Sequence, residues 1–287
     1  MNAQFPVGAP SSPGARQLVS KWVNVLLSPL GVRLTNERVV ARQGSLLETA
    51  RRHAALVSEM EGMLRETIFT DLPQRERRAE LLTGVDGTNL TEAMYVIDRL
   101  HKSMHLPGDV CEFGVAQGTT SAILANELID GGKNLWLFDS FEGLPAPTDK
   151  DVLIDDILGL KSMAAYQGEM AFARDLVEAK LASVGFPPER TKIVKGFVPQ
   201  SFEGVELPKE VCFAYVDFDF YEPILVALEF LGDRLPVGGH VVVDDYGFFS
   251  SGARTAVDEF LVSHPGDYDF SLPYNSAGHF CMLTKLR

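Results

Sequence analysis

The segment DVCEFGVAQG, residues 109–118, decides the fold class of this chain. It begins with a short apolar run and ends in a loop that carries Gly114 and Gly118. A helical pattern follows from Thr119 to Ile129, and Gly131-Gly132 ends it, because glycine after the last turn is a common helix stop. We therefore interpret this part of the chain as a buried strand, a glycine loop and a helix.

The alternation of strands and helices continues to the end of the chain. Apolar runs predict further strands at 135–139, 192–195, 212–216 and 240–243, and helical patterns lie at 88–104, 171–184, from 221 onward and at 253–262. Apolar strands separated by helices are typical of a parallel sheet that is covered on both faces. Two short strands near 267–272 and 279–284 have no helix between them, so we expect a final antiparallel hairpin. The predicted fold class is a doubly wound α/β sheet.

The first 80 residues do not show this alternation of strand and helix patterns. Residues 1–15 are rich in Pro, Gly and Ser, which predicts a disordered tail. Residues 16–80 have helical periodicity that breaks at 28–31, and we expect a helical extension before an α/β domain that spans 81–287.

Arginines gather near the end of the predicted extension. Arg75, Arg77 and Arg78 alternate with Glu76 and Glu80. Such interleaving favours a solvated helix face over a phosphate-binding patch.

Composition restricts the partners and the compartment. The 287 residues include 26 basic and 39 acidic ones, and the net charge of −13 would repel nucleic acid and anionic membranes. We see no signal peptide, and the apolar runs are far shorter than the ~20 residues of a membrane span. Cys111, Cys212 and Cys281 lie far apart within apolar runs, so we expect reduced core thiols in a cytoplasmic protein.

Ligands of doubly wound sheets bind beyond the carboxyl ends of the strands. The first strand contains Glu112 there, and its loop fails the dinucleotide fingerprint G-x-G-x-x-G because Ala116 and Thr119 replace two glycines. A loop without this fingerprint does not bind a pyrophosphate, and a carboxylate within the strand can pair with an ammonium. Both features suit a nucleoside with an amino-acid tail, such as S-adenosylmethionine. Asp139, at the end of the second strand, would then bind the ribose hydroxyls. The alternative is that the glycines only permit close packing of strand and helix.

Four further acids follow the two strands at 212–216 and 240–243. Asp217 and Asp219 are two residues apart, so in extended chain they point to the same side, and Asp244 and Asp245 end the next strand. Neighbouring strands are about 4.8 Å apart, so these carboxylates can converge and need a cation to offset their repulsion. Oxygen ligands favour Mg²⁺ or another hard divalent ion over zinc. Alternatively, Asp219 caps the following helix and Asp245 caps a loop.

Four motifs combine into a family resemblance. The segments EFGVAQGTTS (112–121), LFDSFEGLP (137–145), VDFDFYEP (216–223) and VVVDDYG (241–247) resemble the macrocin O-methyltransferase (TylF-type) family over about residues 81–287. The resemblance implies a class I methyltransferase fold, S-adenosylmethionine as the cofactor and a divalent metal, usually Mg²⁺. It also implies methyl transfer to a sugar hydroxyl of a glycosylated small molecule, and N-terminal helices that contribute to a lid and to a homo-oligomer, a dimer or higher.

The resemblance carries residue roles with it. It implies that Asp217, Asp244 and Asp245 bind the metal and that Asp219 is the general base. The cofactor-binding residues that it implies are Glu112, Gly114, Val115, Gly118, Asp139, Ser140, Phe141, Gly196, Phe197 and Asp217. The chain departs from the family in having Ala116-Gln117-Gly118-Thr119 in place of Trp-Arg-Gly-Gly, and Phe197 in place of Trp. These departures concern the identity of the acceptor more than the type of reaction.

Three other functions fit parts of the pattern. A catechol-type methyltransferase would use the same metal to chelate the adjacent oxygens of a small phenolic diol. A methyltransferase-like scaffold could bind a ligand without catalysis, although crowded carboxylates would then serve no purpose. A nicotinamide-dependent dehydrogenase is disfavoured by the failed glycine fingerprint.

Overall fold

The computed structural model describes residues 37–274 and 277–287, with side chains from residue 45 onward. The predicted tail at 1–15 and the helix break at 28–31 lie outside this part of the chain. The chain divides into two compact units between Ala55 and Leu56, and helix α2 (Glu37–Thr67) runs across the division. A boundary between helical extension and α/β domain near residue 80 stays a prediction. None of the described helices has the length and apolar character needed to cross a membrane.

The second unit contains one seven-stranded sheet with strand order β3-β2-β1-β4-β5-β7-β6. The strands are β1 (Asp109–Phe113), β2 (Leu135–Asp139), β3 (Thr191–Lys195), β4 (Val211–Val216), β5 (His240–Val243), β6 (Tyr268–Ser271) and β7 (Cys281–Lys285). The first five pair in parallel, whereas β7 is antiparallel to both β5 and β6. The doubly wound α/β class and the final antiparallel hairpin are thereby confirmed.

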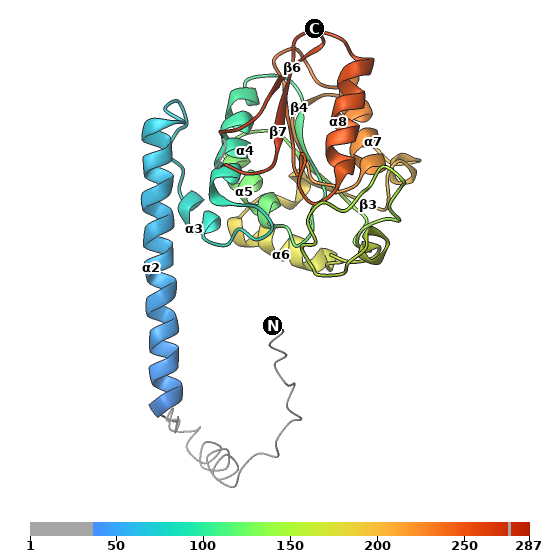
Figure 1. Ribbon diagram of the computed structural model, residues 1–287. Coiled ribbons are helices and arrows are strands. Elements are labelled where there is room, and N and C mark those ends of the chain that lie inside the picture. Colours follow the sequence, from blue (N-terminus) through green and yellow to red (C-terminus); the bar gives the residue numbers. More distant parts are fainter. Residues whose placement is uncertain (1–36, 275–276) are drawn as a thin grey trace. The chain divides into compact units, whose positions relative to one another are not determined.

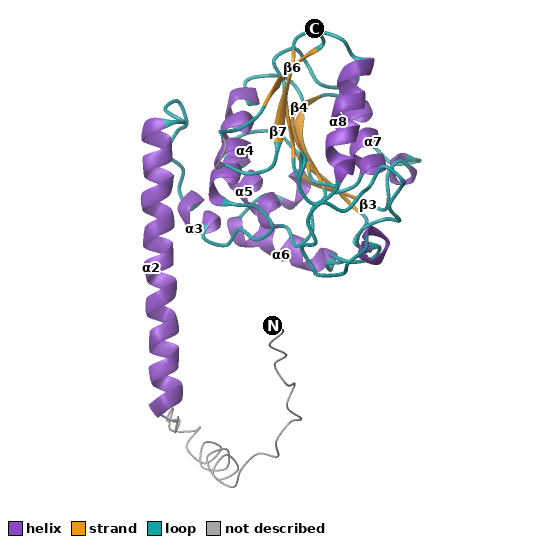
Figure 2. Cartoon of the chain, in the orientation of Figure 1, coloured by secondary structure: helices purple, strands orange, loops and turns teal. Residues whose placement is uncertain are grey.

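Helices cover both faces of the sheet (Figures 1 and 2). They are α3 (Arg78–Leu82), α4 (Leu90–Ser103), α5 (Thr119–Leu128), α6 (Arg174–Val184), α7 (Tyr221–Gly232) and α8 (Ser251–Ser263). One buried apolar cluster joins α4, α5 and α6 to the sheet, and another joins α7 and α8 to the opposite face. Because successive side chains of a strand point to opposite faces, Val110 lies in the first cluster and Cys111 in the second.

Two element boundaries differ from the prediction for a local reason. Helix α4 begins at Leu90 and not at residue 88, because its N-cap is Asn89, whose side chain accepts the backbone N–H of Glu92 at 3.0 Å. Strand β1 ends at Phe113, since Gly114 turns the chain with φ of 85°.

The interpretation of the arginine cluster as a solvated face is wrong for Arg78. This side chain is only 1% exposed. Its guanidinium donates to Glu127 of α5, with Nη2 to Oε2 at 2.6 Å, and to Glu61 of α2 at 3.3 Å. A buried cation needs a countercharge, and here the countercharge comes from helices that are remote in sequence.

The long segment after β2 packs onto the starts of α7 and α8. Its anchor is Asp151, which is 5% exposed. The Asp151 carboxylate accepts the backbone N–H groups of Thr148 and Tyr221 and the hydroxyl of Ser250. The segment thereby closes one side of the sheet's carboxyl edge.

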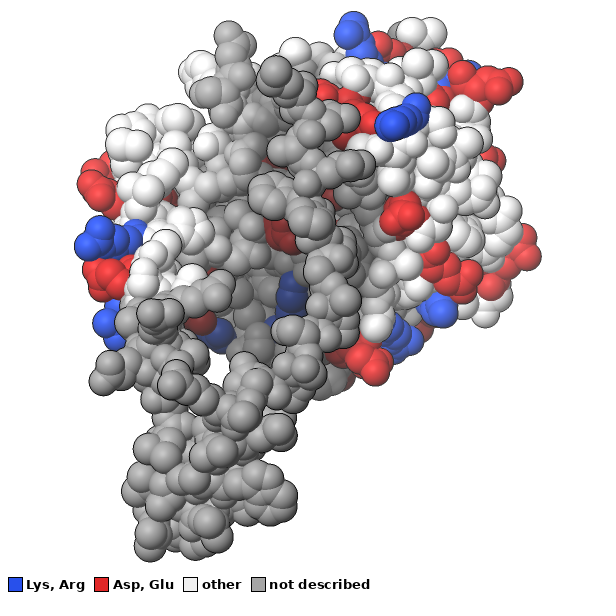
Figure 3. All heavy atoms as spheres, turned by 60° about the horizontal axis from the view of Figure 1, so that its bottom comes forward, with Lys and Arg blue, Asp and Glu red and all other residues white. Residues whose placement is uncertain are grey.

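Charged side chains of both signs are interspersed over the described part of the face in Figure 3. Exposed ion pairs such as Lys150–Glu259, with Nζ to Oε2 at 2.7 Å, are part of this charge distribution.

Candidate active site

A cavity of about 450 Å³ lies beyond the carboxyl ends of β1, β2, β4 and β5. Most of the predicted site residues line it, namely Glu112, Gly114, Val115, Asp139, Ser140, Gly196, Phe197, Asp217, Asp219, Asp244 and Asp245. Gly118 and Phe141 do not. The topology therefore brings the acids that follow four different strands to one concave site.

The two glycines of the loop after β1 have different surroundings. A Cβ on Gly114 would lie 1.7 Å from the backbone carbonyl oxygen of Asp217, so only glycine lets the ends of β1 and β4 meet. A Cβ on Gly118 would lie 3.0 Å from Cα of Val177 in α6. Close packing thus accounts for both glycines, and Gly114 also borders the cavity.

Asp139 holds the glycine loop in place. Its Oδ2 accepts the backbone N–H groups of Val115 at 2.7 Å and Ala116 at 3.0 Å, and its Oδ1 accepts that of Phe141 at 2.6 Å. Because a carboxylate oxygen has two lone pairs, Oδ1 retains capacity for one further donor. Asp139 can therefore accept a ligand hydroxyl from the cavity while it orders the loop.

Glu112 is a buried acid on the cavity wall with 1% exposure. Burial, and in addition the charge of Asp139, raise its pKa to about 8, although the hydrogen bond from the Ser121 hydroxyl opposes the shift. None of the ion pairs within residues 45–274 and 277–287 includes Glu112. An ammonium group of a ligand would supply the missing cation and favour the ionised carboxylate.

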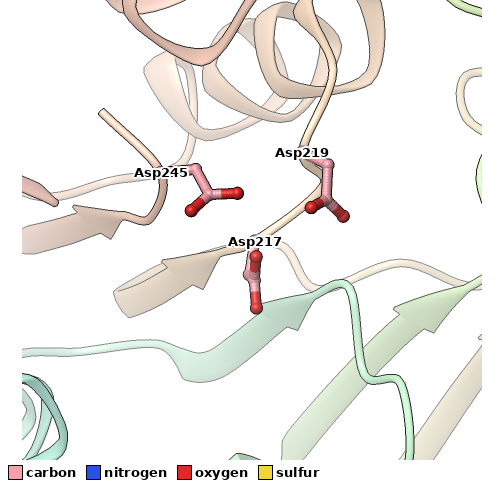
Figure 4. Close-up of side chains that lie close together, drawn as sticks. All are labelled: Asp217, Asp219 and Asp245. Atoms are coloured by element: carbon pink, nitrogen blue, oxygen red, sulfur yellow. The ribbon is translucent and has the colours of Figure 1, made fainter. Parts of the chain in front are cut away.

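Asp217, Asp219 and Asp245 form an acid triple at the ends of β4 and β5. One carboxylate oxygen from each lies within 4.8 Å of the other two. Figure 4 shows Asp245 and Asp219 facing each other across the end of β4, with Asp217 beside them. Asp219 and Asp245 adopt the left-handed backbone region, with φ of 61° and 56°, which is uncommon outside glycine and is often found at functional sites.

Burial and, after it, the charge of the neighbouring Asp244 raise the pKa of each member of this acid triple. The pKa of Asp219 reaches about 7, and those of Asp217 and Asp245 lie well above the ordinary range. These raised pKa values mean that crowding at this site opposes full ionisation of the three carboxyls in the absence of a cation. A hard divalent cation would offset the repulsion between these carboxylates, and oxygen atoms are the ligands that such a cation prefers.

Asp244 lies next to the acid triple, and each of its carboxylate oxygens already accepts a hydrogen bond from the protein. Its Oδ2 accepts the hydroxyl of Tyr215 at 2.7 Å, and its Oδ1 accepts the backbone N–H of Asp245 at 2.8 Å. The predicted metal ligands were Asp217, Asp244 and Asp245. The carboxylates whose oxygens converge include Asp219 in place of Asp244.

Asp219 does not cap the next helix. The N-cap of α7 is Phe220, which makes no side-chain cap hydrogen bond, and the N–H of Tyr221 is bound by Asp151 instead. The alternative that Asp219 is only a helix cap is therefore wrong.

Sequence reasoning missed several residues of the cavity wall. Ile157, Leu158, Met170 and Phe172 come from the long segment after β2, and Ile157 is 45% exposed. Their positions depend on how that segment packs, and no local pattern predicts it. Tyr215 was also missed, although its place two residues before Asp217 puts both side chains on one side of an extended chain.

Known proteins resemble this chain in sequence and fold. A family model described as Macrocin-O-methyltransferase (TylF) matches residues 36–267, which begins well before the region that the motifs covered. The 8-demethyl-8-(2,3-dimethoxy-alpha-L-rhamnosyl)-tetracenomycin-C 4'-O-methyltransferase of Streptomyces olivaceus is 27% identical over 204 residues, 67% of this chain and 74% of that protein. The mycinamicin III 3''-O-methyltransferase of Micromonospora griseorubida is 24% identical over 197 residues, 63% of this chain and 75% of that protein.

The solved structure of the O-methyltransferase NovP has a similar fold. It superposes with a TM-score of 0.59 at 19% identity, over 82% of this chain and 100% of that one. The resemblance read from the four motifs is thereby confirmed.

Proposed function

The chain belongs to the macrocin O-methyltransferase (TylF) family, and from this we propose that it methylates a sugar hydroxyl of a glycosylated small molecule, with S-adenosylmethionine and a divalent cation. It is an O-methyltransferase with the class I methyltransferase fold. The observation that supports the finer proposal is the shared cavity, which is bordered both by Glu112 and Asp139 and by the acid triple. A relative whose name specifies a rhamnosyl 4'-O-methylation supports the sugar acceptor.

The β1–β2 side of the cavity fits the cofactor. Glu112 is a buried carboxylate that forms no ion pair with any side chain in the described part of the chain, and it would bind the ammonium of the methionyl tail. Asp139 would accept a ribose hydroxyl through the free lone pair on Oδ1. When bound, S-adenosylmethionine supplies an activated methyl group on a sulfonium.

The β4–β5 side fits the metal. Asp217, Asp244 and Asp245 remain the proposed ligands, because an oxygen of Asp244 that already accepts one hydrogen bond keeps a second lone pair. A hard divalent cation bound there would lower the pKa of an acceptor hydroxyl and orient it. A bound cation would also favour the ionised forms of Asp217 and Asp245, whose pKa burial raises in its absence.

Asp219 is the proposed general base. Without a cation, burial and the charge of Asp244 raise the pKa of Asp219 to about 7, and a cation bound nearby would lower it, so that the Asp219 carboxylate would be ionised and able to accept a proton. Asp219 also lies beside Asp217 and Asp245, close enough to reach a hydroxyl bound between them. We therefore expect Asp219 to take the proton of the attacking oxygen.

Calorimetric titration with S-adenosylhomocysteine, with NAD as the control, tests the cofactor site. Binding of the first and not of NAD is the expected result, and the reverse would contradict the proposal. Methyl transfer is then measured with a sugar-bearing acceptor and with an aromatic diol, each with and without chelator. Transfer to the diol alone would favour the catechol-type alternative.

The variant Asp219→Asn separates the two possible roles of this residue. If Asp219 is the general base, this substitution leaves the affinities for Mg²⁺ and S-adenosylhomocysteine unchanged and reduces turnover by about 10²–10⁴-fold. A matching loss of metal affinity would instead make Asp219 a metal ligand.

Light scattering of the purified chain would test the proposed homo-oligomer.

A further inference from the structure

A buried tyrosine lies directly behind the acids of the proposed metal site. Tyr215 of β4 is 1% exposed, and it pairs in register with Val242 of β5. Asp217 and Asp244 each follow this pair by two residues. Because side chains two apart in extended chain point to the same side, Tyr215 is placed beneath both acids.

The hydroxyl of Tyr215 fixes the orientation of Asp244. It donates to Oδ2 of Asp244 at 2.7 Å, a distance typical of a strong hydrogen bond to a carboxylate. Both groups are buried, so water does not compete for the contact.

Asp244 in turn binds the backbone of Asp245. Its other oxygen, Oδ1, accepts the backbone N–H of Asp245 at 2.8 Å. Asp245 has φ of 56°, in the left-handed region that most residues other than glycine avoid. The hydrogen bond helps to hold this backbone conformation, in which the Asp245 carboxylate faces Asp219.

The surroundings of Tyr215 leave its hydroxyl little freedom. Oε1 of Glu92 in α4 lies 3.4 Å from it. Oε2 of Glu92 lies close to Gly278, where an added Cβ would be 2.8 Å from it. The Tyr215 hydroxyl thus lies between Asp244 and a residue of a helix that is remote in sequence from the acids.

We propose that Tyr215 is a positioning residue of the divalent-cation site, which it orders by holding Asp244 and, through Asp244, the backbone of Asp245. The inference rests on the metal dependence proposed above. Partners that hydrogen-bond to metal-ligating carboxylates typically contribute 10–100-fold to metal affinity. Tyr215 contacts neither acceptor nor cofactor in this role.

Titration of Mn²⁺ into the full-length chain, followed by the paramagnetic resonance of the free ion, tests the proposal. We compare the natural sequence with Tyr215→Phe, which removes only the hydroxyl. The matched control is Tyr268→Phe, because Tyr268 is a buried tyrosine of β6 whose hydroxyl accepts from Lys285 at 3.2 Å, away from the site. Melting curves of all three chains establish that each is folded.

We expect Tyr215→Phe to weaken Mn²⁺ binding at least tenfold, with S-adenosylhomocysteine affinity in the absence of metal unchanged. Turnover of this variant should recover at saturating metal. Mn²⁺ affinity within twofold of that of the natural chain, or an equal loss in Tyr268→Phe, would overturn the proposal. If the natural chain itself does not bind Mn²⁺, the metal part of the proposed function fails, and the inference fails with it.

Discussion

The assignment of Glu112 to the ligand ammonium, proposed above, predicts that cofactor binding depends on pH. Burial and the charge of Asp139 raise its pKa to about 8, so Glu112 is mostly protonated at neutral pH in the free protein. A ligand ammonium pairs with the ionised form only. Binding must therefore be accompanied by loss of a proton at every pH below about 8.

The size of the effect follows from the pKa of Glu112. Each pH unit below that value costs about 1.4 kcal/mol for deprotonation before the ammonium can bind. The affinity for S-adenosylhomocysteine should therefore rise about tenfold from pH 6 to pH 7 and level off near pH 8. At pH 7 binding should release about 0.9 of a proton, since roughly nine in ten molecules hold it beforehand.

Calorimetry in buffers with different ionisation enthalpies measures both the affinity and the released protons. S-adenosylhomocysteine is the appropriate ligand, because it carries the ammonium without a sulfonium charge that would act on the acid triple. The control is Glu112→Gln, which keeps the shape and the hydrogen bond from Ser121 and removes the titration. Equal proton release and an equal pH slope in the two proteins would refute the assignment of Glu112 to the ammonium.

Three further changes test the structure that holds the site. Gly114→Ala places a Cβ 1.7 Å from the carbonyl oxygen of Asp217, so we expect a loss of more than about 4 kcal/mol in the free energy of unfolding, and a melting temperature within a few degrees of the natural chain would contradict this. Arg78→Met leaves the buried Glu127 with His101 as its remaining basic partner and should cost about 3–5 kcal/mol in denaturant titrations, with part of the loss recovered when Glu127→Leu is added. Asp151→Ala leaves the N–H of Tyr221 without its acceptor and should cost about 1–3 kcal/mol and speed proteolysis within 145–160; unchanged cleavage there would show that the segment does not depend on Asp151.

Much of the fold could be predicted because its signals are local. The strands at 135–139 and 240–243 have the predicted bounds, since a buried parallel strand is a short apolar run with polar residues at its ends. The carboxyl ends of parallel strands meet at one edge, so the sequence also predicted that Glu112, Asp139 and the acids after β4 and β5 border one cavity. The TylF-type resemblance depends on the same short motifs, and the family match confirms it.

What the sequence alone determined is therefore the order of elements, the edge of the sheet at which ligands bind and the family. Only the tertiary structure decided that Asp219 joins Asp217 and Asp245, that Asp244 bonds to Tyr215, and that Gly118 packs on α6. The physical reason is the separation in sequence between the residues that determine each feature. A strand or helix follows from residues a few positions apart, whereas the direction of a carboxylate depends on a left-handed backbone angle and on a hydroxyl from a neighbouring strand. Those partners meet only after the sheet has formed.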